Sequence, residues 1–494
     1  MTAGDRSSKS PSDADTLIDK DFWRGRKKQF GIAVTASFVL LQLLFLTVIS
    51  YLFGSVFEQH TRIHNLKVLT VDYDGGIIGR SLQAAGESLT APDFPGLVNK
   101  SASDYEDVSD VIEAVRKGDY WAAVYVHAGA SDRLSAALQG GTAASTYNAS
   151  DAMTYVWNEI RYATVAAGSI KGNLETLVSV SRVAYTRING TAALSALNQS
   201  DPAAVSAYLN PIQSSSYNIK PSPQSTKTVY NTIPMVMGII MNFFFLMAVN
   251  GVASSLQLYS HIPFFQNWLV RVVLSLTYTC AGSLCQSAYF WAFKESWDQP
   301  ASVFFLVWMA MWLYQHVQFL VFDVATTFIP MAFSSFFVLS WVIANITATI
   351  APFELSAGFY RWAYALPAKE TFDILITIWS GGAVNRLYRN LPIMFAWVVV
   401  MGPSAFYALR YRCKKAAEVA AAEEEAKKER EEGLKKEGRE LEKKERGPPP
   451  VHRGTAGTDG AGEGMVGLVE KRESEYFPSA PTPFEGTLRR VFSA

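Results

Sequence analysis

The stretch FGIAVTASFVLLQLLFLTVISYLFGSVF, which runs from Phe30 to Phe57, decides the fold class because it contains no charged residue. Hydrocarbon offers no hydrogen-bond partner to the backbone, so a helix that crosses a membrane needs about 20 apolar residues. This stretch is longer than the apolar region of a signal peptide, and it lacks a convincing small-residue cleavage site. We therefore expect residues 30–57 to form a retained signal anchor, and the chain to be an integral membrane protein.

Five further apolar stretches follow after residue 230. Buried helices of a soluble core rarely run this long without a charged residue. The sequence therefore predicts an α-helical polytopic membrane protein with about six spanning helices, one followed by five, and a membrane domain over residues 231–411. The five predicted spans of that domain are Thr232–Leu256, Leu269–Phe293, Ala301–Phe322, Ala325–Ile350 and Leu391–Leu409.

Basic residues at the borders predict the orientation, because the cytosolic flanks of spanning helices carry an excess of Lys and Arg. Such residues precede the first predicted span and follow the last one. We therefore expect residues 1–29 and the tail, residues 412–494, to lie in the cytosol. The basic residues are Arg24, Arg26, Lys27 and Lys28 before the first span, and Arg410, Arg412, Lys414 and Lys415 after the last.

Residues 58–230 are predicted to form a large extracytoplasmic domain. Strands alternate with helices along this segment, which suggests a small α/β unit. Four N-glycosylation motifs support its location outside, since such acceptors are used only on the lumenal side. These candidate sites are Asn99, Asn148, Asn189 and Asn198. The predicted strands are 65–72, 121–126 and 142–147, and the predicted helices are 78–89, 103–117, 131–138 and 151–187, before an extended connector at 214–226.

The composition narrows the classes of partner. The 44 basic and 44 acidic residues balance, so the net charge favours neither nucleic acid nor anionic lipid. We expect membrane lipids around the chain and no nucleic-acid partner. None of the three cysteines lies in residues 58–230, which excludes a disulfide-stapled domain there. His60 and His64 have the spacing of metal ligands, but no third ligand is grouped with them, so we expect exposed interfacial histidines and no metal site.

Motifs of the common enzyme classes are missing from the sequence. It contains no GxxxxGK[ST], GxSxG or HExxH, and no GxGxxG between a strand and a helix. We therefore expect no enzyme activity, no catalytic residue and no cofactor. A function driven by ATP would need a separate ATPase as partner.

Few ionisable residues fall within the predicted spans, and such residues are costly in a membrane and functional by default. His316 is the one that lies well inside a span, with Tyr314 and Gln318 nearby. Its role is either substrate or proton binding, or helix packing, and the second is favoured. Asp323 is expected at a tight cytosolic turn between the fourth and fifth spans. Interhelical hydrogen bonds are expected for Asn242 and Asn250.

The outer loop, residues 352–390, combines aromatic side chains with arginine, which suits the level of lipid headgroups. The stretch from Thr371 to Trp379 is too short to span and is predicted to be interfacial or re-entrant. Contact with lipid or substrate is one reading, and plain anchoring is the favoured one. The aromatic motif of the loop consists of Tyr360, Arg361, Trp362, Tyr364 and Pro367.

The tail begins with alternating acidic and basic blocks from Lys414 to about Arg446. This pattern predicts a solvated helix that continues the last span and carries ion pairs four residues apart. Three prolines, Pro448 to Pro450, stop it, and the remainder is predicted to be disordered.

One span, an outside α/β domain and five further spans is the order found in ABC-2-type permeases. The strand and turn Val71–Gly76 with Gly79 look like the start of the ectodomain of that family. The segment Tyr360–Pro367, with Gly381 and Gly382, is similar to its final outside loop. Within this superfamily the chain most resembles the fungal nitrosoguanidine-resistance membrane proteins, a family defined by a domain of unknown function, over residues from about Phe22 to Arg412.

The resemblance implies a fungal protein of the plasma membrane, or else of an endomembrane, that is tied to drug tolerance, export or lipid distribution. It carries no established catalytic residues. We expect a transport-related protein without an ATPase of its own. The alternative is a membrane regulator or adaptor that does not transport and binds a partner through its ectodomain or tail. An ATPase, a regulatory protein and a second copy of the chain are the protein partners considered.

The length of the uncharged predicted spans gives the first testable prediction. Tagged full-length protein should stay with vesicles in alkaline carbonate, because apolar helices do not leave lipid for water. Residues 58–230 should also resist protease that is added to the cytosolic face. Release of the protein by carbonate, or cleavage of that segment from the cytosolic face alone, would contradict the predicted topology.

Overall fold

The computed structural model describes residues 26–445 of the 494-residue chain. Among these residues, five helices are long and apolar enough to cross a membrane. Their presence confirms a multi-pass membrane protein made mainly of helices. They are α1 (Arg26–Val56), α9 (Ile233–Ser255), α11 (Phe264–Ala292), α12 (Ala301–Phe328) and α15 (Leu387–Glu445). The predicted disordered end of the tail lies outside the described residues.

The predicted boundary between the fourth and fifth spans is wrong. Helix α12 continues to Phe328, and α13 (Met331–Thr349) begins only after Pro330. Proline lacks a backbone N–H and restricts the residue before it, so Pro330 sets the break rather than the polar residues near Asp323. Helix α13 is apolar but shorter than the five spanning helices, so the structure supports five spans and one shorter apolar helix.

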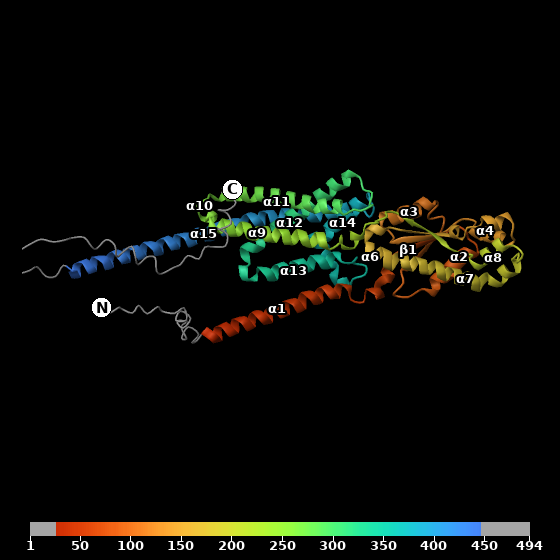
Figure 1. Cartoon of the computed structure of the whole chain (residues 1–494), viewed down its shortest axis with the longest axis horizontal. Coiled ribbons are helices and arrows are strands. Elements are labelled where there is room, and N and C mark those ends of the chain that lie inside the picture. Colours follow the sequence, from red (N-terminus) through yellow and green to blue (C-terminus); the bar gives the residue numbers. More distant parts are fainter. Residues whose placement is uncertain (1–25, 446–494) are drawn as a thin grey trace, which may run out of the picture. The chain divides into compact units, whose positions relative to one another are not determined.

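Helix α12 is the centre of the helical part. It packs against α9, α11, α13 and the short helix α14 (Pro367–Trp379). Figure 1 shows α9, α11 and α12 running side by side. The largest fully buried side chains of this part, Tyr314, Phe319 and Phe322, all belong to α12. Helix α1, in contrast, exposes most of its apolar side chains and packs mainly against α13, as expected of a helix that faces lipid.

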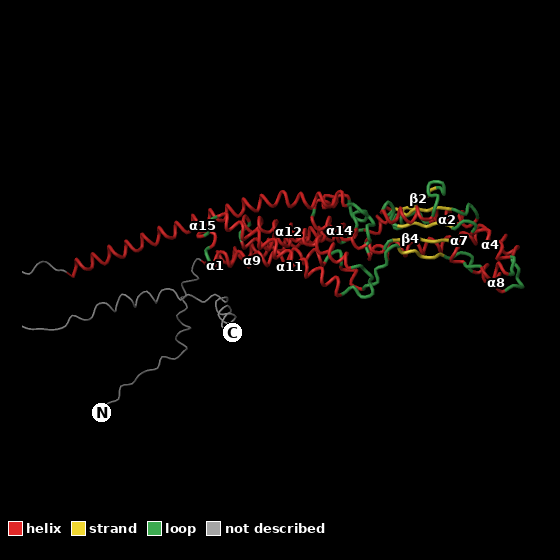
Figure 2. Tube along the Cα trace, turned by 90° about the horizontal axis from the view of Figure 1, so that it is seen from above, coloured by secondary structure: helices red, strands yellow, loops and turns green. Residues whose placement is uncertain are grey.

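A five-stranded sheet lies between α1 and α9 in the sequence (Figure 2). Its strand order is β2-β1-β3-β4-β5. Strand β1 pairs in parallel with β2 and β3, β4 pairs antiparallel with β3, and β5 is parallel to β4. The strands are β1 (Lys67–Asp72), β2 (Gly96–Lys100), β3 (Ala122–Val126), β4 (Met153–Trp157) and β5 (Ser214–Asn218).

Helices cover both faces of this sheet. Val68 of β1 belongs to the hydrophobic core with α2 (Ile77–Ser88) and α7 (Gly172–Ala196), while Leu69 and Val71 face α3 (Val108–Lys117). The alternation follows from the two-residue period of a strand. Two small helices, α4 (Ala130–Leu138) and α8 (Pro202–Leu209), pack together beside the sheet.

Several local predictions for this unit are wrong. Residues 142–147 were expected to form a strand, but Thr142–Thr146 is the short helix α5. The expected helix 151–187 begins with strand β4, whose Thr, Tyr, Val and Trp side chains favour a strand. The expected connector 214–226 begins with β5, and β2 was not predicted, because both are short strands at the sheet edges. The predicted strands at 65–72 and 121–126 are confirmed.

The turn after β1 requires glycine at two positions, Gly75 and Gly79. One oxygen of the Asp72 carboxylate accepts hydrogen bonds from the backbone N–H groups of Asp74 and Gly75, at 2.9 and 3.1 Å. Gly75 has a φ of +62°, which favours glycine. A Cβ at Gly79, one turn into α2, would overlap the Asp72 carboxylate. The sequence from Asp72 to Gly79 is therefore one packing unit.

Replacing Gly79 with alanine should therefore destabilise the protein by about 1–3 kcal/mol, the usual cost of overpacking a filled site. Gly172→Ala is the matched control, because it is also helical and nothing lies within 4 Å of its added Cβ. The control should be neutral or stabilising by about 0.5–1 kcal/mol. Thermal unfolding of the purified full-length variants measures both, and equal stabilities would contradict the role assigned to Gly79.

Candidate functional site

The three residues singled out on α12 point to three different neighbours. The Tyr314 hydroxyl donates to the carbonyl of Met235 on α9 at 2.8 Å. The side-chain oxygen of Gln318 accepts from the indole of Trp341 on α13 at 2.7 Å. His316 is half-buried, and its Nδ1 lies 3.1 Å from the hydroxyl of Ser275 on α11. Tyr314 and Gln318 lie one turn apart on the same face of α12 and their side chains interact, whereas His316 is directed to α11, so the structure does not gather all three residues in one cluster.

Four buried polar side chains near these residues form what we call the polar layer: Gln286, Gln315, Gln318 and Asn242. The Gln315 amide donates to the side-chain oxygen of Gln286 at 2.7 Å. Three atoms of the layer have no hydrogen-bond partner among residues 26–445: Gln315 Oε1, Gln318 Nε2 and Asn242 Oδ1. All three side chains are fully buried. An unpaired buried amide costs several kcal/mol in an apolar medium, so these atoms are costly for the folded chain.

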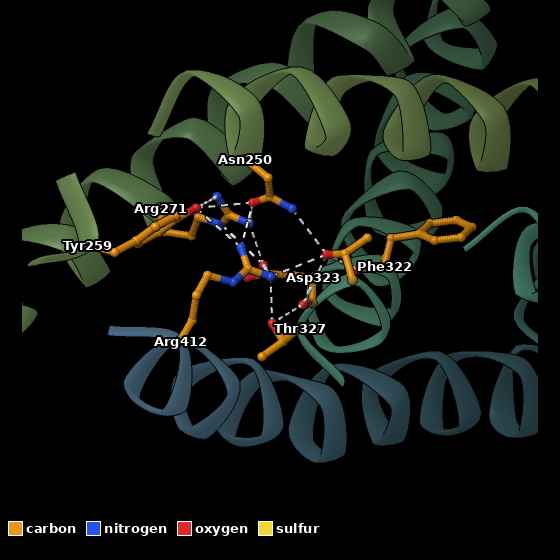
Figure 3. A network of polar contacts seen from close by, with 8 residues as sticks. Asn250, Tyr259, Arg271, Phe322, Asp323, Thr327 and Arg412 are labelled. Carbon is orange, nitrogen blue, oxygen red and sulfur yellow. Dashed lines mark hydrogen bonds and ion pairs between the residues drawn. The ribbon is translucent and has the colours of Figure 1, made fainter. Parts of the chain in front are cut away.

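A network of charges lies further along α12, where sequence reasoning expected only a turn (Figure 3). Asp323 is buried within the helix, and its Oδ1 pairs with the Arg271 guanidinium of α11 at 2.5 Å. The expectation that Asp323 sits at an exposed turn is therefore wrong, because the helix continues past it. Asn250 is an interhelical residue as predicted, since its Oδ1 accepts from Arg271 at 2.7 Å. Asn242 instead bonds to Gly238 of its own helix.

The network also reaches the last spanning helix. The Arg412 guanidinium of α15 donates to the Asn250 oxygen and to the Thr327 hydroxyl, and it lies 4.0 Å from Asp323. The Tyr259 hydroxyl, from the short helix α10 (Leu258–His261), donates to the same Asn250 oxygen at 3.1 Å. Two guanidinium groups thus share one carboxylate, and the network joins α9, α10, α11, α12 and α15. A buried pair of this kind is costly to break from one side.

The aromatic motif of the outer loop contacts the first helix. The Tyr360 hydroxyl donates to the carbonyl of Tyr51 on α1 at 2.9 Å, and their rings lie 5.0 Å apart. Trp362 also lies near the Tyr51 ring, with 6.3 Å between centroids. Tyr364 instead stacks under the Arg389 guanidinium at 4.6 Å, Pro367 begins α14, and Arg361 is exposed.

The stretch Thr371–Trp379 forms most of α14, which is buried against α12 and α13. Three charged residues of this helix, Lys369, Glu370 and Asp373, are largely buried. Sequence reasoning missed them, because the search was confined to segments long enough to span. The signal was present: carboxylates and a lysine interrupt an otherwise apolar helix.

The predicted glycan acceptors all lie in the sheet unit. Asn99, Asn148 and Asn198 are exposed, and Asn189 is half-buried with its amide 3.2 Å from the Tyr185 hydroxyl. Their use as acceptors stays a prediction. His60 and His64 are both exposed, and residues 26–445 contain no group of three or more His, Cys, Asp or Glu side chains that could hold a metal ion.

The charge network yields a prediction about stability. Asp323→Asn should lower the free energy of unfolding by about 3–5 kcal/mol, because it leaves two buried guanidinium groups without a counter-charge. Denaturation of the purified chain, followed by circular dichroism, measures the change. Glu424→Gln is the control, since it removes an exposed ion pair with Lys428 and should have no measurable effect. A similar small effect for Asp323→Asn would show that the network does not hold the helices together.

No solved structure matches this chain. A family model described as "Protein of unknown function (DUF3533)" matches residues 37–402, which covers the sheet unit and reaches from α1 into α15. The match includes Gly79, the buried polar layer of α12 and the outer loop. Because it spans well over half of the 494 residues, the chain belongs to the DUF3533 family of proteins of unknown function.

Proposed function

We propose that this protein is transport-related and moves amphipathic molecules, either drug-like compounds or lipids, without an ATPase of its own. The proposal includes the kinship with fungal nitrosoguanidine-resistance proteins and ABC-2-type permeases that the sequence suggests. It also places both termini in the cytosol, the sheet unit outside, and the chain in the plasma membrane. The observation that carries it is the layer of buried, incompletely paired polar groups around α12.

The unpaired atoms of that layer argue against a purely structural role. A helix bundle in lipid gains nothing from burying an amide whose hydrogen bonds are unmet. Gln315 Oε1 is an acceptor and Gln318 Nε2 is a donor, so together they suit a ligand that carries both kinds of group. The surrounding side chains of α12 are large and apolar, as an amphipathic ligand requires.

The polar groups are also spaced along one helix. Asp323 lies eight positions after Gln315, which corresponds to about 12 Å along the helix at 1.5 Å per residue. The first belongs to the unpaired layer and the second to the closed charge network. One helix thus carries a closed charge network and, about two turns earlier, a layer with unmet hydrogen bonds. The proposal assigns ligand contact to the open layer and support of the helices to the closed network.

Proteoliposomes that contain the purified full-length chain test the proposal. Two probes are used, a lipid with a fluorescent NBD headgroup and the cationic dye rhodamine. We expect protein-dependent movement of at least one probe, and a rate that falls about tenfold in Gln315→Leu with Gln318→Leu, since each change removes a hydrogen bond worth roughly 0.5–1.5 kcal/mol. His316→Ala should have a smaller effect, because His316 lies at the edge of the layer.

Met309→Leu is the matched control, because Met309 lies on the exposed apolar side of the same helix and should leave the rate unchanged. Circular dichroism confirms that each variant is folded. If folded protein moves neither probe faster than empty vesicles do, and an ATPase recovered with it from membranes does not restore movement, the transport proposal fails. In that case the regulator or adaptor alternative takes its place.

A further inference from the structure

Glu370, near the start of α14, and Asn390, near the start of α15, are fully buried and hydrogen-bonded to each other, but each keeps one unpaired oxygen. One oxygen of Glu370, Oε2, accepts a hydrogen bond from the amide nitrogen of Asn390. The Arg389 Nε lies 3.4 Å from the same oxygen. The other carboxylate oxygen, Glu370 Oε1, has no hydrogen-bond partner within the described part of the chain, and neither has Asn390 Oδ1. Neither Glu370 nor Asn390 has any exposed surface.

Both unpaired atoms, Glu370 Oε1 and Asn390 Oδ1, are acceptors, so one hydrogen-bond donor shared between them would satisfy both. A carboxylic acid pairs with a primary amide through two hydrogen bonds, in which the acid accepts from the amide nitrogen and donates to the amide oxygen. The first of these bonds is present between Asn390 and Glu370. A proton on Oε1 supplies the second and satisfies both unpaired oxygens at once.

The charges around Glu370 leave it only partly compensated. Lys369 Nζ pairs with Asp373 at 2.5 Å, and Arg389 Nη2 contacts Asp373 at 3.0 Å. Both cations therefore direct their shortest contacts to Asp373, and Glu370 keeps only the longer contact with Arg389. A metal cation would meet repulsion from both basic groups, whereas a proton neutralises the carboxylate that remains.

The remaining elements packed against α14 add few charges. Helix α13 contains no ionisable residue, and the ionisable residues of α12 make no direct contact with Glu370. The sheet unit contributes the Tyr162 hydroxyl, 3.4 Å from Lys369 Nζ. Other ionisable groups near this cluster are Arg161, Glu354, Tyr364 and Arg386.

Burial raises the pKa of Glu370 above its ordinary value, and Arg389 opposes that shift. Helix α14 lies outside the five spanning helices. Burial and the Arg389 guanidinium therefore act in opposite directions on the pKa of the same carboxyl.

We propose that Glu370 and Asn390 form a proton-binding site and, resting on the transport function proposed above, that this proton is the coupling ion of transport. Proton uptake forms one O–H bond at Oε1, neutralises the carboxylate and weakens its contact with Arg389. No oxidant, nucleotide or metal is required. A proton gradient across the membrane, acting through this site, would supply the driving force that a chain without a nucleotide-binding motif otherwise lacks.

Infrared difference spectra of the reconstituted full-length chain between neutral and acidic pH test the site directly. We expect the C=O band of a buried carboxylic acid to grow as the pH falls, and to be absent in Glu370→Gln. Glu354→Gln is the matched control, because that carboxyl lies in the same region and its loss should leave the band intact. Asn390→Ala should shift the band, since it removes the hydrogen-bonding partner. The same band in Glu370→Gln would overturn the site.

Stability as a function of pH gives a second measure and checks folding. Because the carboxyl pKa is raised in the folded state, the folded chain holds more protons than the unfolded chain between the ordinary pKa and the raised one. Stability from this group is therefore full below the ordinary carboxyl pKa and is lost as the pH rises through that window. Glu370→Gln, which imitates the protonated acid, should fold and should lose this slope.

Transport under an imposed pH gradient separates the two proposals. With the NBD lipid and rhodamine as probes, a gradient should change the wild-type rate several-fold and leave Glu370→Gln unaffected. Movement that ignores the gradient in both proteins would overturn proton coupling while the transport function stands. An infrared band without any movement of either probe would leave the proton site in place and remove the transport function.

Discussion

Hydrocarbon gives a buried charge nothing to bond with, and the helical part of this chain depends on how that constraint is met between Arg271 and Asp323. Their ion pair joins α11 to α12, and Asn250 and Arg412 extend it to α9 and α15. Loss of either partner would leave an uncompensated charge among apolar side chains. The four spanning helices that meet there are therefore held together as one group.

Other buried polar groups in the helices are only partly hydrogen-bonded. Gln315, Gln318 and Asn242 in the central layer, and Glu370 with Asn390 on α14 and α15, each keep an atom without a partner. A chain selected for stability alone pairs or removes such atoms. Exceptions of this kind are expected at functional positions, where a ligand, water or proton completes the set. The closed network therefore accounts for support, while the open groups are the candidates to which the proposed function is assigned.

The sequence was informative where one physical requirement dominates. Length without charge identified α1, α9, α11, α12 and α15, because lipid demands it. It failed at β4, whose β-forming side chains were assigned to the start of a helix, and at β5, a short edge strand of polar residues that forms through pairing with β4. The sequence singled out His316 and Gln318, which lie in or beside the polar layer, and their role stays a prediction, but the partners of Asp323 and Glu370 come from distant helices. Pairing between helices of different spans is not visible in local spacing.

Helix α14 connects the proposed proton site to other parts of the chain through direct contacts. Glu370 contacts Asn390 of the last spanning helix, while the adjacent Lys369 contacts Tyr162 of the sheet unit. The loop after α14 is bonded to the same unit, since the Val384 N–H donates to the carbonyl of Arg116 at 2.9 Å. A change in the charge of Glu370 therefore acts on a short, buried helix whose two ends are tied to the sheet unit and to α15.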